Sequence, residues 1–344
     1  MYRCRLLPTV CLLSSVHAAA VLAFVAALLI CSSSQATVIV DNTFNSGLIT
    51  NPPIALTAPY STTYSENGVD QDGSGDITSL WTVNNNGGST TPSVGHMVSA
   101  MNTNGTSSYQ MTTYFTAPGT AVVLANPGDQ MVLTWVFTPT GVVAQNTSQA
   151  FDVAVVDSPV RVATINNSLP TTGYAGYAIF GNMGTTLGAS NSFALKEAIA
   201  NPTDLMSTSG NWGANGVSGT LTNDPNATTG KTGYASGTQY TMTWTLTRGM
   251  SNDLMVDVKM VGGSIGGTGT VEDTYDDTSP NSFTYDTFSF RPNKGSTTAT
   301  SFDTTLFEVQ GPLVNVPEPG SLILLGLGAG ALGLITLGRR KVAE

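Results

Sequence analysis

Residues 240–247 read Tyr-Thr-Met-Thr-Trp-Thr-Leu-Thr, and this stretch decides the fold class. Large apolar side chains occupy every second position, and threonine fills every position between them. A period of two predicts a strand with one buried face and one solvated face, as in antiparallel sheets. Residues 248–253 then supply a turn, and residues 254–260 alternate again. The two stretches together predict a β-hairpin.

The same signals recur along the chain. Gln130–Thr138 alternates in the same way, after the turn residues Asn-Pro-Gly-Asp at 126–129. Further predicted strands, separated by clusters of Gly, Pro, Asn and Asp, are Val38–Asp41, Ser108–Phe115, Phe151–Val156, Gly173–Phe180, Ser282–Phe290 and Ser301–Val309. Only Ser192–Ala200 has a helical composition, before Asn-Pro at 201–202. We therefore predict an all-β protein, a two-sheet antiparallel sandwich of jelly-roll type with one short helix.

Five segments resemble the large secreted bacterial sandwiches related to concanavalin A-like and laminin G-like domains. They are DNTF at 41–44, YFTAP at 114–118, NPGDQMVLTWVF at 126–137, YTMTWTLTR at 240–248 and DTFSFRP at 286–292. The resemblance spans most of the region between the two ends of the chain. It implies the sandwich fold and a role that faces glycans.

The N-terminus has the pattern of a secretory signal peptide. Arg3 and Arg5 are basic, residues 18–30 form an unbroken apolar run, and Ser34 and Ala36 are small residues at the positions that a signal peptidase reads. We predict a signal peptide over 1–36; the alternative is a retained membrane anchor. All three cysteines lie inside this segment. The mature chain would then have no disulfide and no thiolate chemistry.

The region between the signal and the C-terminal segment is acidic. Residues 37–316 contain seven basic and 20 acidic residues, a net charge of −13. Such a surface repels phosphate backbones and anionic lipids, so nucleic acid is excluded as an expected partner.

Residues 70–76 resemble a calcium loop. Asp70, Asp72, Ser74 and Asp76 place oxygen atoms at alternate positions, and Gly75 stands where such a loop turns sharply. Ca²⁺ prefers a cage of oxygen ligands. However, Trp81 stands where the bidentate glutamate of such loops belongs. The alternative is a surface turn rich in Asp and Gly.

Two other features suggest chemistry without defining it. Trp212, beside Asn211, is predicted to lie in a loop, where an exposed ring could stack on a sugar; the alternative is an aromatic anchor folded into the protein. The acidic residues 272–277 form either a second ion site or a solvated loop. His96 could act as the base of a hydrolase only beside a serine nucleophile, and the sequence contains no Gly-x-Ser-x-Gly motif. We therefore interpret His96 as a surface or strand-end residue.

The C-terminus has three parts in a fixed order. Pro317, Glu318 and Pro319 precede an apolar run over 321–338, and Arg339, Arg340 and Lys341 follow it. Eighteen residues at about 1.5 Å each span roughly 27 Å, enough for a thin bilayer. Basic residues stay on the cytoplasmic side, so the sandwich would project outward.

This tail resembles the PEP-CTERM sorting signal that exosortases recognise. The resemblance implies a Gram-negative-type envelope, processing by an exosortase-type enzyme, a membrane-anchored stage, and a destination at the cell surface or in the exopolysaccharide matrix. The predicted domains are the signal peptide 1–36, the sandwich 37–310, a linker with the Pro-Glu-Pro motif 311–320, the transmembrane helix 321–338 and a basic cytoplasmic tail 339–344.

Two functional hypotheses follow for the sandwich. The first is a non-enzymatic surface or matrix protein that binds extracellular polysaccharide or packs against other matrix components. The second is a secreted glycan-active enzyme on the same fold, which would need a pair of carboxylates. Its 20 acidic residues offer many pairs, and no motif selects one of them.

Overall fold

The alternating threonine stretch forms strand β15 (Tyr240–Arg248), which pairs antiparallel with β16 (Leu254–Val261). Trp244 lies opposite Val258, and both side chains are fully buried. The threonines between the apolar residues of β15 are half-buried. The predicted hairpin and its buried face are therefore confirmed.

The structure is a computed structural model, and it describes residues 35–47, 60–84, 88–101, 109–158, 160–161, 173–199, 205–206, 211–214, 217–218, 222–293 and 295–314. The chain divides into two units, and the unit Thr37–Pro312 contains the strands described below, apart from the ends of the first and last. The predictions for residues 1–34 and 315–344 lie outside the described ranges. No helix within those ranges is long and apolar enough to cross a membrane.

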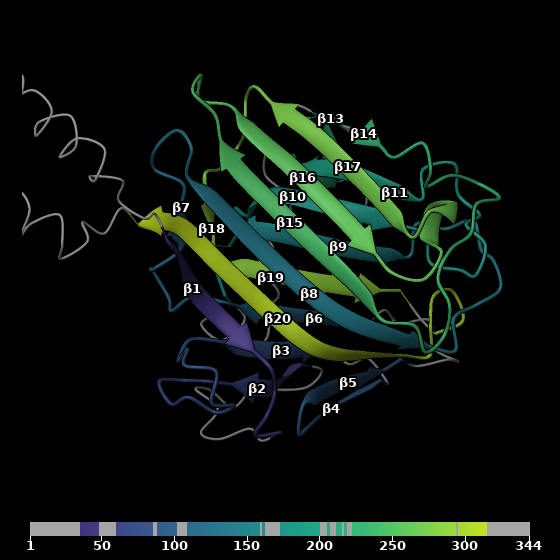
Figure 1. The fold of residues 1–344 in the computed structure, drawn as a ribbon, viewed down its shortest axis with the longest axis horizontal. Helices are drawn as coiled ribbons and strands as arrows, with labels where there is room; N and C mark the ends of the chain where they lie inside the picture. The colour runs from purple at the N-terminus through teal and green to yellow at the C-terminus, as the bar shows by residue number, and fades with distance from the viewer. Residues whose placement is uncertain are drawn as a thin grey trace, which may run out of the picture. The chain divides into compact units, whose positions relative to one another are not determined.

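The described residues form two large antiparallel sheets and one small ribbon (Figure 1). The first sheet has the order β17-β16-β15-β8-β20-β5-β4, with β1 also on β20; its further members are β1 (Gln35–Asn42), β4 (Ser89–Ser93), β5 (His96–Ala100), β8 (Gln130–Thr140), β17 (Thr270–Asp277) and β20 (Ser301–Val314).

The second sheet has the order β13-β12-β11-β10-β9-β19-β6-β3-β2, with β14 also on β11. Its members are β2 (Tyr60–Ser65), β3 (Leu80–Asn84), β6 (Gln110–Tyr114), β9 (Phe151–Asp157), β10 (Ala175–Gly181), β11 (Phe193–Ala198), β12 (Trp212–Ala214), β13 (Val217–Ser218), β14 (Thr222–Asn223) and β19 (Thr287–Pro292). The ribbon joins β7 (Val122–Val123) to β18 (Thr284–Tyr285). A 3-10 turn spans Ile265–Gly267.

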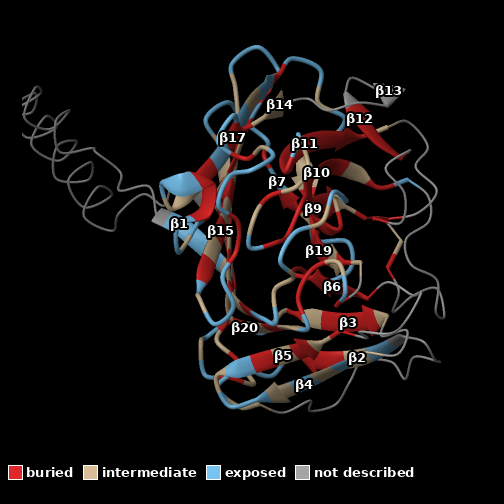
Figure 2. Cartoon of the chain, turned by 90° about the vertical axis from the view of Figure 1, so that its right-hand side faces the viewer, coloured by how far each residue is buried: buried red, intermediate tan, exposed pale blue. Residues whose placement is uncertain are grey.

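The main core lies between the two sheets, where Figure 2 shows the buried residues of facing strands. Aromatic rings fill its centre. Trp135 of β8 stacks on Phe137 with ring centroids 4.1 Å apart and contacts Phe290 of the other sheet at 4.7 Å. Burying rings of this size contributes more to stability than any single polar contact, because each removes a large apolar area from water. The all-β sandwich is thus confirmed.

A second buried cluster covers the outer face of the second sheet. It contains Ala154, Val156, Tyr174, Ala178, Phe180, Ala198, Leu205, Met206 and Trp212. Gln110 of β6 donates to the carbonyl oxygen of Leu205 at 3.3 Å, and Arg291 of β19 donates to that of Met206 at 2.6 Å. The middle of this sheet is therefore buried on both faces, which explains why its strands β9 and β10 are almost continuously buried.

The prediction of a helix at Ser192–Ala200 was wrong, because the segment forms strand β11. Its residues pair with β10 on one side and with β12 and β14 on the other. Phe193 and Leu195 enter the main core, while Lys196 lies on the outer face with its ammonium 4.3 Å from the Phe180 ring centroid. Sheet pairing and burial on both faces override the helical propensity of Ala, Leu, Lys and Glu.

Candidate functional site

The predicted calcium loop lies between β2 and β3 and packs against the end of β1. Asp72 and Asp76 are buried, as is Glu66 at the start of the connection, whereas Asp70 is exposed. The structure thus adds Glu66 to the acidic residues that the sequence pattern selected, and it separates Asp70 from them.

Asp72 acts as an anchor between the loop and β1. One carboxylate oxygen accepts hydrogen bonds from the backbone N–H of Thr43 at 2.6 Å and of Phe44 at 3.0 Å, and the other accepts from the backbone N–H of Ser74 at 3.0 Å. Burial alone would raise the pKa of Asp72, but these hydrogen bonds outweigh it and hold the pKa below its usual value. Phe44 has a φ of 58°, so the ionised carboxylate stabilises a strained turn.

The pKa of Glu66 is shifted in the opposite direction to that of Asp72. Burial, together with the charges of Asp72 and Asp76, raises its pKa to about 7, although hydrogen bonds from the Tyr64 hydroxyl and the Gln71 backbone N–H oppose the shift. The pKa values of Asp76 and Asp41 are raised as well, first by burial and then by neighbouring carboxylates. Four acidic side chains therefore crowd this end of β1, and their charges repel one another.

The four predicted calcium ligands are not assembled around one point. Asp70 caps its own turn, accepting from the backbone N–H of Gly73 at 2.6 Å and of Gly75 at 3.2 Å, and Asp72 is bound to the turn that follows β1. Within the described ranges, no three His, Cys, Asp or Glu side chains are grouped as a metal centre requires. In this conformation the loop fits a turn held by its own carboxylates better than a formed calcium cage.

Trp212 is not an exposed platform for sugar stacking. It is fully buried in β12, with its ring 5.5 Å from that of Tyr174 and 6.0 Å from that of Phe180. Asn211 is also buried, and its carbonyl oxygen accepts from the backbone N–H of Ile199 at 3.0 Å. The prediction of a loop was wrong at this tryptophan, and the alternative of an aromatic anchor describes its packing.

The remaining sequence candidates have ordinary positions. Residues 272–277 belong to strand β17 instead of a loop, with Glu272 and Asp276 exposed and Asp273 and Asp277 buried. His96 begins β5 and is half-exposed, with its Nδ1 2.9 Å from the Asp303 carboxylate. The sorting residues Pro317–Pro319 and Arg339–Lys341 lie beyond the described part of the chain.

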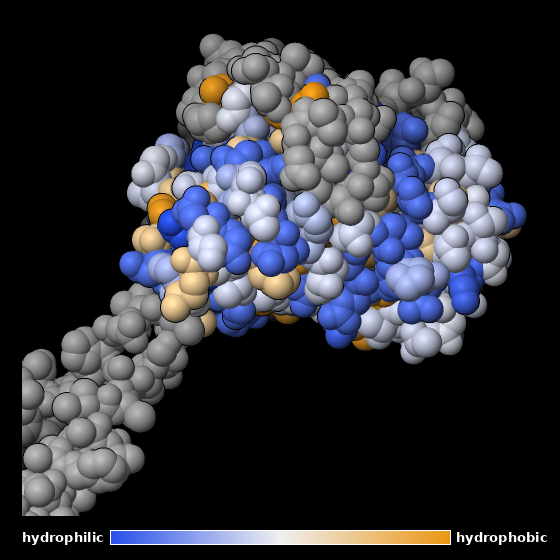
Figure 3. All heavy atoms as spheres, turned by 90° about the horizontal axis from the view of Figure 1, so that it is seen from above, coloured by the Kyte–Doolittle hydropathy of each residue, from blue (hydrophilic) through white to orange (hydrophobic). Residues whose placement is uncertain are grey.

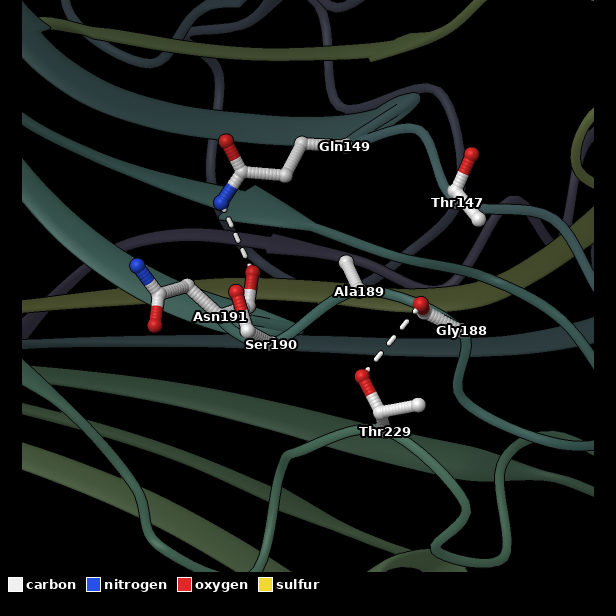
Figure 4. Close-up of a pocket in the computed structure, with 7 residues that line it drawn as sticks. All are labelled: Thr147, Gln149, Gly188, Ala189, Ser190, Asn191 and Thr229. Atoms are coloured by element: carbon white, nitrogen blue, oxygen red, sulfur yellow. Dashed lines mark hydrogen bonds between the residues drawn. The ribbon is translucent and has the colours of Figure 1, made fainter.

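A polar pocket that no sequence pattern predicts lies at one end of the sandwich. It has a volume of about 540 Å³, and its lining residues are Thr147, Gln149, Gly188, Ala189, Ser190, Asn191 and Thr229 (Figure 4). They come from the segment before β9, the β10–β11 connection and the segment after β14. We refer to it as the amide pocket.

The amide pocket carries hydroxyl and amide groups and no ionisable side chain. The Gln149 amide donates to the carbonyl oxygen of Asn191 at 2.7 Å, which ties two of the segments together. The Thr229 hydroxyl faces the carbonyl oxygen of Gly188 at 3.4 Å (Figure 4). Ser190, Asn191 and Thr147 are exposed, so their polar groups are accessible to a ligand. Neutral donors and acceptors in this number suit a neutral, hydroxyl-rich ligand.

The fold is an all-β sandwich of two antiparallel sheets, and a known sorting motif follows it in the sequence. Residues 315–341 match the PEP-CTERM protein-sorting motif. The predicted recognition of this motif is confirmed, and it marks the chain as an exported protein. No curated protein matches the chain significantly.

Several solved structures are similar to the chain at low identity. The exoplasmic/lumenal domain of VIP36 in a Ca²⁺- and Man2-bound form has 12% identity and a TM-score of 0.40, covering 73% of this chain and 87% of that one. Lectin II from Ulex europaeus has 10% identity and a TM-score of 0.37, with 69% and 93% covered. A protein of unknown function from Shewanella oneidensis MR-1 has 10% identity and a TM-score of 0.35, with 92% and 98% covered.

Proposed function

We propose that this protein is a non-enzymatic component of the cell surface or extracellular matrix that is exported, processed at its C-terminus and binds glycan through its sandwich. The observation that carries the proposal is the match of residues 315–341 to a protein-sorting motif. The acidic, cysteine-free composition of residues 37–316 suits a solvated protein outside the cell.

The sorting part of the proposal has a physical logic in the sequence. Pro317 and Pro319 remove backbone donors and favour an extended chain, which leaves Glu318 accessible at the membrane face. The apolar run 321–338 would hold the precursor in the bilayer, and the basic residues behind it would resist transfer. An exosortase-type enzyme would then cleave near the motif. Changing Arg339, Arg340 and Lys341 to Ser should mis-sort the protein in its host.

The glycan-binding part of the proposal is supported by the amide pocket. Its hydroxyl and amide groups match the alternating donors and acceptors of a sugar, and the absence of an ionisable side chain from its lining favours a neutral one. A neutral hydrogen bond contributes about 0.5–1.5 kcal/mol, so single contacts should be modest and several must act together.

A glycan-binding screen with the full chain in detergent, followed by variants, tests this assignment. Asn191→Ala should weaken binding of a selected neutral glycan about three- to tenfold, as loss of one hydrogen-bonding amide predicts. Ser93→Ala, at an exposed position on β4 of the other sheet, is the matched control and should change nothing. If Asn191→Ala binds the glycan as tightly as the unchanged protein does, the amide pocket is not the binding site.

Calcium at the loop 70–76 is a second proposal, favoured by one observation. Burial raises the pKa values of Glu66, Asp76 and Asp41, and neighbouring carboxylates, with Asp72 among them in each case, raise them further. A divalent cation would relieve that repulsion. Asp70 would have to leave its own turn to complete the ligand set. Calcium should then raise the melting temperature by mass action, and Asp72→Ala should abolish the rise. No shift at millimolar calcium would reject the ion.

The rival hypothesis is a glycan-active enzyme on the same sandwich. Reproducible turnover of an extracellular polysaccharide by the purified protein would establish it, whereas saturable binding without product supports the proposal made here. Failure of both would leave a purely structural role.

A further inference from the structure

A second pocket lies at the other end of β9 from the amide pocket. Gln149 lies two residues before the strand and Asp157 ends it, and the seven strand residues span roughly 23 Å. This second pocket has a volume of about 410 Å³ and is bordered by the β7–β18 ribbon, labelled at the left of Figure 1. We refer to it as the Asp157 pocket.

Its arginine is already neutralised. The Arg161 guanidinium donates to the Asp286 carboxylate at 2.8 Å and to the carbonyl oxygen of Thr116 at 2.5 Å, and it lies 5.0 Å from the Tyr114 ring centroid. Both Arg161 and Asp286 are buried. Because its donors serve the protein itself, the arginine is held in a structural position and does not make the pocket a site for anions.

Asp286 is equally saturated. One carboxylate oxygen accepts from the backbone N–H of Ser158 at 2.9 Å and from the Thr287 hydroxyl at 2.6 Å, while the other accepts from Arg161. A carboxylate engaged in this way is poorly placed to exchange a proton with a substrate, so the pair Asp157 and Asp286 does not resemble the two free carboxyl groups of a glycosidase.

Asp157 supplies the charge that remains. Within the described ranges, no donor forms a hydrogen bond with its half-buried side chain, and with Arg161 paired to Asp286 the pocket carries one net negative charge. Burial, and then the charge of Asp286, raise the pKa of Asp157 to about 6, while Arg161 opposes the shift. At pH 7 the group is still mostly ionised. An ionised, partly desolvated carboxylate without a partner favours a cation.

Part of the pocket lining is apolar. Its apolar residues are Pro118, Ala121 and Val123, and Val123 is 50% exposed although its side chain is purely hydrocarbon. The lining also includes the hydroxyl-bearing residues Ser158 and Thr284. Such a cavity would accept a compact ring with one C–H face, several hydroxyls and one positive charge.

We propose that the Asp157 pocket binds an amino sugar with a free, protonated amine, held by the Asp157 carboxylate with its ring against Val123 and Pro118. This site differs from the amide pocket in place and in charge, so it does not depend on the proposed function. A volume of about 410 Å³ suits a compact ring better than a long flexible chain.

Calorimetric titration of the full chain in detergent at pH 7 tests the proposal, with glucosamine as the probe and N-acetylglucosamine and glucose as neutral counterparts. Glucosamine should bind at least tenfold more tightly than either, because only it forms a charge-assisted hydrogen bond. Asp157→Asn should weaken glucosamine binding about tenfold or more while leaving the neutral sugars unaffected. Asp276→Asn, which removes an exposed charge on β17, is the matched control and should change nothing.

The variant Asp157→Asn should fold, since it removes a carboxylate that burial and Asp286 already disfavour. Its melting temperature checks this. Equal affinity for glucosamine and glucose, or full glucosamine binding by Asp157→Asn, would overturn the proposal. Tighter binding of lysine amide than of glucosamine would show that the pocket reads an amine alone and would overturn the sugar assignment. Asn191→Ala should leave glucosamine binding intact, which separates this site from the amide pocket.

Discussion

Replacing Glu66 with glutamine should make the stability of the sandwich less dependent on pH. The pKa of Glu66 is raised from 4.5 to about 7, chiefly by burial, so the folded state binds this proton more tightly than the unfolded chain does. Its contribution to stability is therefore complete below pH 4.5 and is lost as the pH rises through about 7. Glutamine stays neutral throughout.

The magnitude follows from the two pKa values. Between pH 5 and pH 8, a shift from 4.5 to about 7 removes about 2 to 3 kcal/mol of stability, at about 1.4 kcal/mol for each pKa unit. Glutamine also loses one good acceptor for the Tyr64 hydroxyl or the Gln71 N–H, at a cost of about 1 kcal/mol at either pH. Glu66→Gln should thus be slightly destabilising at pH 5 and stabilising by about 1 to 2 kcal/mol at pH 8.

Urea unfolding of residues 37–312 at the two pH values, in the presence of a chelator, measures this difference. Glu272→Gln on the exposed face of β17 is the control, and its effect should not change with pH beyond a few tenths of a kcal/mol. An effect of Glu66→Gln that is the same at pH 5 and pH 8 would refute the account of a buried carboxyl with a raised pKa.

Three further predictions concern the sandwich itself. Residues 37–312 alone should be soluble and β-rich by circular dichroism, and a helix content above about a third would contradict the fold. Trp212→Ala should cost about 3 to 5 kcal/mol in urea unfolding, because it empties the second cluster, and a loss below 1 kcal/mol would mean that the cluster is not packed as described. Unfolding free energy should fall as pH rises from 5 to 8, since burial raises the pKa of both Glu197 and Asp273 to about 7; a rise instead would contradict these pKa directions.

Regular alternation made much of the fold predictable from the sequence. Strands β8, β15 and β16 pair edge to edge in one sheet, and each buries one face on the main core. Their outer faces carry threonine in β8 and β15 and Asp257 and Lys259 in β16, and they stay partly solvated, so the period of two is visible in the residues themselves. Figure 3 views the molecule from above, and the coloured residues on that side are mostly hydrophilic, with a few apolar residues among them.

The same rule failed where a strand is covered on both faces. Strand β11 buries its whole length, so Ala, Leu and Lys follow one another without alternation and suggest a helix. Strand β17 alternates exposed and buried residues, but carboxyl groups occupy positions of both kinds. Its sequence therefore lacks the alternation of apolar and polar residues that marks a strand. Trp212 resembled a loop residue because β12 is only three residues long. Each error arose from tertiary contacts that no local window contains.

The two pockets were beyond prediction for a related reason. The amide pocket joins residues 147–149, 188–191 and 229, and the Asp157 pocket joins Asp157 to Val123 and Asp286. The residues of each pocket come together because β9 pairs with β10 on one side and with β19 on the other, although these strands are far apart in the sequence. By contrast, the sorting motif is contiguous, and contiguous motifs are readable without a fold.

Export and processing at the C-terminal motif can be observed on the mature protein itself. Mass spectrometry of the protein extracted from the cell surface of its native host would show where the chain ends. We expect a mature protein that lacks residues beyond about Pro319, with its most C-terminal peptide ending near the Pro-Glu-Pro motif. Recovery of an intact peptide ending at Glu344, in a host with an active exosortase, would contradict processing and leave a plain membrane anchor.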